Sequence, residues 1–163
     1  MNAPFAPAFK ATLIFCAAVL TSQPALAKSK VYNVVTANDV LALVKEYGEA
    51  KFDEPQDGMK IIEGTVDEMV YYIFLYDCEI GKGCRDLVFS AAFDTDVMDL
   101  SMINDWNKGS KFGQAYLDSD GDANIDLALN LFGGITHKNL DDSFDWWRVV
   151  LSQFSNKVFE EEE

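Results

Sequence analysis

The sequence predicts an α+β fold in which helices pack on an antiparallel sheet. Apolar runs of strand length come in pairs joined by turn residues, as at 69–76 and 87–93. Between residues 140 and 158 the apolar residues instead recur every three or four positions, which is typical of a long amphipathic helix. The expected order along the chain is α-β-β-β-β-α-β-β-α in one folded domain.

The first half of this order is predicted from caps and apolar runs. A helix is expected at 36–48, because Thr36 can cap it and Gly48 can end it. Strands are expected at 51–54, 58–66, 69–76 and 87–93. The run 69–76 is apolar on both faces, which predicts a central strand covered on one side by helices and on the other by further helices or a partner.

The second half contains two more helices and a second hairpin. The second helix is expected to begin at the cap Asp94-Thr95 and to end at Gly109, with an apolar stripe of Val97, Leu100, Ile103 and Trp106. A hairpin of 111–118 and 124–132 follows. Thr136 then caps the last helix, whose stripe is Leu140, Phe144, Trp147, Leu151, Phe154 and Val158. Trp146 falls beside this stripe, so we expect it to be exposed and available to a partner.

Composition excludes several classes of protein. The 163 residues are 49% hydrophobic and 13% aromatic, far too apolar for a disordered chain. There are 27 acidic and 13 basic residues, which give a net charge of −14. Nucleic acids and anionic membranes are bound through Lys and Arg, so this acidity argues against both as partners.

Residues 1–27 have the features of a secretory signal peptide. They contain no acid, one base at Lys10, a short apolar run at 11–20 and an Ala-x-Ala site that ends at Ala27. A bilayer span needs about 20 apolar residues, which disfavours an uncleaved anchor. We expect cleavage after Ala27, export to the periplasm, and a single mature domain at 28–163 without a membrane span.

Two of the three cysteines, Cys78 and Cys84, remain in this mature domain. In an oxidising compartment such a pair is most simply a disulfide, here across the mouth of a hairpin loop. The chain-entropy model assigns a loop of this size about 2 kcal/mol. The alternative is a redox-active pair with Lys82 and Arg85 lowering a thiol pKa, although the C-x-x-C spacing of thiol oxidoreductases is absent.

Catalytic and cofactor motifs are missing from the sequence. His137 is the only histidine, so a zinc site is not expected, and no nucleophile elbow or phosphate-binding loop occurs. We expect no enzyme activity and no cofactor. The alternative is a hydrolase that uses paired carboxylates in a tryptophan-lined cleft, with Asp99, Asp105, Asp141, Asp142 and Asp145 as candidates.

The segment Asp118 to Asp126 places oxygen-bearing side chains at every second position, as calcium loops do. An EF-hand would need Gly where Ala123 stands and Glu where Leu129 stands. A hairpin turn rich in Asp, Gly and Asn is therefore the favoured interpretation, with weak calcium binding as the alternative.

A set of residues in the second half resembles the YbjN family of bacterial proteins, often labelled sensory transduction regulators. The residues that carry the resemblance are Asn104, Trp106, Asn107, Phe112, Ala115, Tyr116, Leu117 and Asp118, followed by 125–129 and 133–136. The similarity covers about 38–154 and includes the cysteine pair. Where many members have Arg before the Phe, this chain has Lys111.

The resemblance implies a fold like that of class I type III secretion chaperones and an interaction module that has no catalytic residues to carry over. We therefore expect an exported, non-enzymatic protein that binds a protein or peptide. A homodimer through the sheet face or a helix is one form that this could take.

Overall fold

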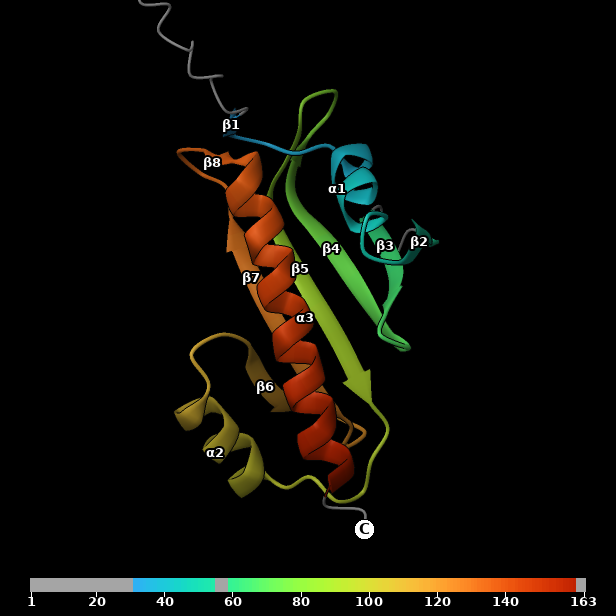
Figure 1. The fold of residues 1–163 in the computed structure, drawn as a ribbon, viewed down its shortest axis with the longest axis vertical. Coiled ribbons are helices and arrows are strands. Elements are labelled where there is room, and N and C mark those ends of the chain that lie inside the picture. The colour runs from blue at the N-terminus through green and yellow to red at the C-terminus, as the bar shows by residue number, and fades with distance from the viewer. Residues whose placement is uncertain (1–30, 55–58, 161–163) are drawn as a thin grey trace, which may run out of the picture.

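The computed structural model describes residues 31–54 and 59–160, so the expected signal peptide lies outside the described residues. Its main element is a six-stranded antiparallel sheet with the strand order β2-β3-β4-β5-β7-β6 (Figure 1). These strands are β2 (Glu49–Phe52), β3 (Lys60–Val66), β4 (Met69–Glu79), β5 (Gly83–Phe93), β6 (Gln114–Leu117) and β7 (Ala123–Asn130). The predicted α+β fold is confirmed. Two short strands, β1 (Val31–Tyr32) and β8 (Ile135–Thr136), pair separately and are additional to the expected order.

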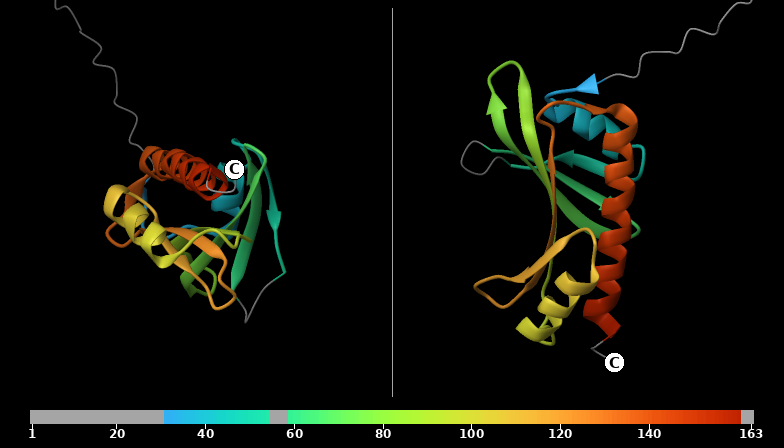
Figure 2. Two further views of the ribbon diagram at one scale, coloured as in Figure 1. Left: turned by 90° about the horizontal axis from the view of Figure 1, so that it is seen from below. Right: turned by 90° about the vertical axis from the view of Figure 1, so that its left-hand side faces the viewer.

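Two helices, α1 (Ala37–Val44) and α3 (His137–Glu160), cover one face of the sheet (Figure 2, left). A third helix, α2 (Leu100–Gly109), lies beside β6 at the edge (Figure 1). As predicted, α1 has Thr36 as its N-cap, and a reciprocal pair of hydrogen bonds with Asp39 completes a capping box. In the part of the chain that the structure describes, no helix is both long and apolar enough to cross a membrane.

The core lies between α3 and the centre of the sheet. The predicted stripe of α3 is buried along its whole length: Leu140, Phe144, Trp147, Leu151, Phe154 and Val158. The Phe144 ring packs against Tyr71 of β4 at a centroid distance of 5.6 Å, and the Trp147 ring stacks on Phe89 of β5 at 5.9 Å. These aromatic contacts fix α3 against the two longest strands.

The opposite face of the sheet has no helix over it among the described residues. On β4 this face presents Val70, Tyr72, Phe74 and Tyr76, with Val70 50% and Tyr76 42% exposed. The rings of Tyr72, Phe74 and Tyr76 follow one another at 6.5 Å between neighbouring centroids. The prediction that 69–76 is a central strand is confirmed, since β4 lies between β3 and β5.

Several predicted boundaries are wrong. Helix α1 ends at Val44 and not at Gly48, and two further errors bear on the second half of the chain. Helix α2 begins at Leu100, where the Asp99 side chain accepts a hydrogen bond from the Met102 N–H, and not at Asp94-Thr95. Leu100 is consequently 73% exposed and is not part of the buried stripe. The strand expected at 111–118 begins only at Gln114, and this later start shapes the site described next.

Candidate functional site

The outer edge of β6 is covered by a side chain of α2. The Asn107 Nδ2 donates to the Ala115 carbonyl at 3.0 Å, and the Ala115 N–H donates to Asn107 Oδ1 at 2.8 Å. A side-chain amide thus makes both hydrogen bonds that a neighbouring strand would make. Exposed strand edges invite pairing with other chains, so Asn107 closes this edge to a partner.

At the start of β6, Gly113 turns the chain away from the sheet. Its φ is +78°, a conformation that residues with a Cβ rarely adopt. A Cβ at this position would lie 2.5 Å from Val150 Cγ1 and 3.1 Å from Ile125 Cδ1. Because of this turn Phe112 leaves the strand and packs against Trp146 of α3, with 4.8 Å between ring centroids.

The late start of β6, at Gln114, leaves half of β7 without a neighbour on that side. The pairing ends at Gln114 opposite Asp126, although β7 continues to Asn130. In an antiparallel strand each residue directs its N–H and C=O to one side, and successive residues alternate. The bonds from Asn107 to Ala115 show that Ala115 faces away from β7, so Asp126 bonds to β6. By alternation, Ala128 and Asn130 direct their backbone groups to the same side, where no described strand pairs with them.

A hydrogen bond on the β5 side of β7 confirms that the odd-numbered residues direct their backbone groups away from the open side. The Leu131 N–H donates to the Arg85 carbonyl of β5 at 2.8 Å, which places the odd-numbered residues on the β5 side. The right-hand view of Figure 2 faces this edge of the sheet and shows α2 near its lower end and α3 alongside. The unpaired stretch of β7 at Ala128 and Asn130 is called the open edge below.

A groove of about 520 Å³ runs along the open edge. Its walls come from the segment before β6, from β7 and from the first half of α3, and they are lined by Lys111, Phe112, Gly113, Gln114, Asp126, Leu127, Ala128, Leu129, Asn139, Asp142, Ser143 and Trp146. Trp146, expected to be exposed, is 43% exposed, and Phe112 is 38% exposed. An aromatic pair therefore stands beside unpaired backbone groups.

Asp126 is the most unusual ionisable group in this groove. Burial raises the pKa of its carboxyl, although hydrogen bonds with Ser90 and Tyr116 act to lower it. Its Oδ1 is buried and has no hydrogen-bond partner among the described residues. The pKa of Tyr116 is raised in turn, first by burial and then by the negative charge of Asp126. The Asp126 side chain therefore lies at the rim of the groove, on the helix-free side of β7, and forms no ion pair with the described residues.

The acidic turn between β6 and β7 uses its own carboxylate internally. Asp118 Oδ1 accepts from the N–H groups of Asp120 at 2.9 Å and Asp122 at 3.0 Å, and Oδ2 accepts from Asn124 Nδ2 at 3.2 Å. Burial raises the pKa of Asp118, but these hydrogen bonds outweigh it and the net shift is downward. This is the geometry of a turn stabilised by an Asp side chain. Among the described residues no group of three His, Cys, Asp or Glu side chains is placed to hold a metal ion.

Cys78 and Cys84 lie directly opposite each other on β4 and β5, with 3.9 Å between their Cα atoms, and are placed to form a disulfide. The backbone of Cys84 exchanges two hydrogen bonds with Val35, so the cysteine pair also fastens the segment before α1. The strands extend through the pair, and the turn is shorter than the loop expected from sequence.

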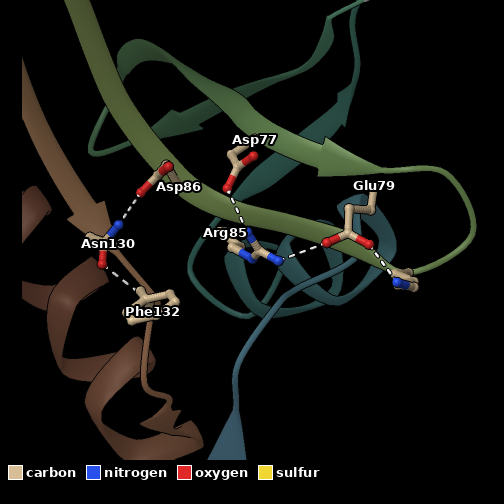
Figure 3. Close-up of polar contacts among 7 residues, drawn as sticks. Asp77, Glu79, Arg85, Asp86, Asn130 and Phe132 are labelled. Carbon is tan, nitrogen blue, oxygen red and sulfur yellow. Dashed lines mark hydrogen bonds and ion pairs between the residues drawn. The ribbon is translucent and has the colours of Figure 1, made fainter.

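Charged residues surround this hairpin (Figure 3). Arg85 pairs with Asp77 at 3.2 Å and with Glu79 at 2.7 Å. On the neighbouring strand the Asn130 side chain donates to Asp86 and accepts from the Phe132 N–H, which ties the end of β7 to β5. These surface contacts stabilise the end of the open edge and leave its backbone uncovered.

Four of the five carboxylates that the sequence offered as catalytic candidates have structural partners. Asp99 caps α2, Asp141 accepts a hydrogen bond from the Tyr47 hydroxyl, and Asp145 lies 3.7 Å from Arg148. Asp105 lies 3.8 Å from Lys108. Asp142 alone of this set lines the groove. His137 begins α3 on the surface, with its ring 6.1 Å from that of Tyr32.

The residues that carry the family resemblance have different roles in the structure. Trp106 packs edge-on against Phe154 at 5.0 Å, Asn107 and Ala115 close the edge of β6, and Phe112 lines the groove. Asn104 is exposed on α2, and Leu117 and Asp118 lead into the turn. The open edge of β7 was not anticipated from sequence. The signal that could have revealed it is Gly113, which interrupts the first strand of the predicted hairpin but not the second.

The comparisons with known proteins support one assignment. Residues 31–160 match the model of the YbjN family, described as "Putative bacterial sensory transduction regulator". No curated protein and no solved structure matches the chain. Because the family match covers most of the sequence, the chain belongs to the YbjN family.

Proposed function

We propose that this protein is an exported, non-enzymatic module that binds an extended segment of another protein along the open edge of β7. The observation that carries the proposal is the position of Ala128, whose backbone N–H and C=O face the groove without a partner strand. A peptide added there would continue the line of β6 and gain main-chain hydrogen bonds. The family description, a regulator of sensory transduction, agrees with a binding role.

The aromatic pair gives such a segment a place to bury side chains. Phe112 and Trp146 are each more than a third exposed, yet they contact one another and line the same groove as Leu127 and Leu129 of β7. Large aromatic residues of this kind contribute much of the binding free energy at protein interfaces. We therefore assign the main anchoring role to Trp146.

Selection of displayed random peptides on the immobilised protein tests the proposal. Peptides recovered on the wild type are then measured against Trp146→Ala and against Val149→Ala, an equally exposed position on α3 outside the groove lining. Loss of binding is expected for Trp146→Ala only. Peptides that bind both variants as tightly as the wild type would show that the groove is not the binding site.

Export is tested separately, by the mass of the protein recovered from the periplasm. A chain that begins at Lys28 is expected, since the Ala-x-Ala site ends at Ala27. A chain that retains Met1 and fractionates with the cytoplasm would contradict the export part of the proposal. It would not bear on peptide binding at the groove.

One observation favours a hydrolase as the second candidate. Asp126 and Asp142 both line the groove, and the raised pKa of Asp126 would suit a general acid. Glycosidases place two carboxylates in one cleft beside aromatic rings. Here this would require the Asp126 side chain, on the helix-free side of β7, to reach round the open edge toward Asp142 on α3. Turnover of aryl glycosides that disappears in both Asp126→Asn and Asp142→Asn would establish this alternative, and absence of turnover would remove it.

A further inference from the structure

The register of the sheet fixes how a strand added at the open edge would present its side chains. Gln114 opposes Asp126, so a strand that continues the line of β6 places successive residues opposite Leu127, Ala128 and Leu129. Cross-strand partners share a face of the sheet. The residues opposite Leu127 and Leu129 therefore face α3, and the residue opposite Ala128 faces the helix-free side.

On the α3 side the added strand would meet an aromatic pair and two leucines, beside the polar side chains of Asn139 and Ser143. Phe112 and Trp146 lie there with the two leucines of β7 below them. Lys111 also lines this side, with its Nζ 5.4 Å from the Phe112 ring centroid, and Asp142 lines it from α3. These two charges oppose each other, so the α3 side selects for apolar side chains and not for a net charge.

On the helix-free side the added strand would meet Asp126. Asp126 lies two residues before Ala128 on the same face of β7, which makes it the diagonal neighbour of the residue opposite Ala128. Diagonal neighbours on a sheet lie about 7–8 Å apart, within the reach of a long side chain. Among the described residues Asp126 forms no ion pair, and its Oδ1 has no hydrogen-bond partner.

We infer that the segment bound at the open edge carries a Lys or Arg between two apolar residues, with the cation placed on Asp126 and the apolar residues placed between the strand and α3. This inference rests on the proposed function and specifies its ligand. The Asp126 carboxylate has hydrogen bonds with Ser90 and Tyr116 but no ion pair among the described residues, and the cation would supply one. Burial makes that carboxylate costly to ionise without a cation. The acidity of the whole chain, −14, would attract such a segment at long range.

The test uses three dye-labelled peptides, Ser-Val-Leu-X-Phe-Thr-Ser, in which X is Lys, Gln or Glu. Binding to the full purified protein is followed by fluorescence anisotropy. The Lys peptide is expected to bind about tenfold more tightly than the Gln peptide, the effect of one charge-assisted hydrogen bond. The Glu peptide is expected to bind more weakly than either.

Two variants locate the effect. In Asp126→Asn the preference for Lys over Gln should fall to about one, whereas Glu49→Gln removes a charge at the other edge of the sheet and should keep the preference. Equal binding of the Lys and Gln peptides to the wild type would overturn the inference, and so would a Lys preference that survives Asp126→Asn. If Asp126→Asn does not fold, the three peptides on the wild type decide alone.

The proposed function fails in a different way. Trp146→Ala should weaken binding of the Gln peptide as well as binding of the Lys peptide, because the aromatic contact does not depend on charge. If the peptides bind the wild type without a Lys preference and do not bind Trp146→Ala, the inference is wrong and the proposed function still holds. Peptides insensitive to Trp146→Ala would remove both.

Discussion

On one side of this sheet two strand edges follow one another, that of β6 and that of β7 beyond it. The first is closed by a side chain and the second is open. The outer edge of β6 is closed by Asn107, whose amide forms both hydrogen bonds with Ala115. The edge of β7 a few residues further on is left open beside an aromatic groove. The contrast shows that the chain closes one edge with a side chain and leaves the neighbouring one unpaired. The unpaired edge is the one that we propose as a binding surface.

The comparison depends first on Gly113, which turns the chain just before β6 and so delays the start of that strand. Gly113→Ala is expected to lower the free energy of unfolding by about 3 kcal/mol, because the new methyl group would clash with Val150 and Ile125 in a left-handed backbone conformation. Urea denaturation measures the loss. Gly109→Ala is the control, since a Cβ there meets nothing within 4 Å. A loss of less than about 1 kcal/mol for Gly113→Ala would mean that the chain can straighten and β6 can extend.

The closed edge is tested by Asn107→Ala. Removing the amide leaves the N–H and C=O of buried Ala115 without partners, which should cost about 2 kcal/mol. Asn104→Ala, on the exposed side of the same helix, is expected to change stability by less than about 0.5 kcal/mol. Thermal denaturation of both variants gives the comparison. Equal stability of the two would contradict the edge-closing role of Asn107.

The open edge should behave differently if, as we propose, its residues serve binding more than folding. Trp146→Ala is expected to cost less than about 1 kcal/mol of stability, since it removes an exposed ring whose main contact is Phe112. The same change should weaken peptide binding about thirtyfold, as the loss of an interface anchor does. Denaturation and anisotropy on one preparation separate these effects. A large stability loss would instead make Trp146 a core residue.

The smallest effect concerns the pH dependence of Asp126. Its pKa is raised by burial, so the folded state holds this proton more tightly than the unfolded chain and stability falls as pH rises through the raised pKa. Asp126→Asn should therefore be more stable than the wild type at neutral pH, and this advantage should vanish in acid. Denaturation across pH measures it. An advantage that stays constant with pH would assign the effect to something other than ionisation.

Much of this fold could be predicted because periodicity and caps are local signals. The buried stripe of α3, the Thr36 cap and the opposed cysteines were all predicted from residue spacing. The start of α2 was not, because Asp94, Thr95 and Asp99 are all good caps and only tertiary packing chooses among them.

The site was harder to predict than the fold. Trp146 could be placed on the surface by its offset from the apolar stripe, as the structure shows. The open edge could not be predicted from apolar alternation, because it arises where one strand of a hairpin stops and the other continues. Only the conformation of Gly113, together with the register of β6 and β7, places Ala128 at that gap.

Amide hydrogen exchange of β7, followed by NMR, tests the central claim most directly. In the free protein the Ala128 and Asn130 amides should exchange fast, whereas those of Leu127 and Leu129, which bond to β5, should exchange slowly. Addition of a bound peptide should slow Ala128 and leave Leu127 unchanged. A protected Ala128 amide in the free protein would show that the edge is already covered, by a second copy or another segment, and would contradict the open-edge account.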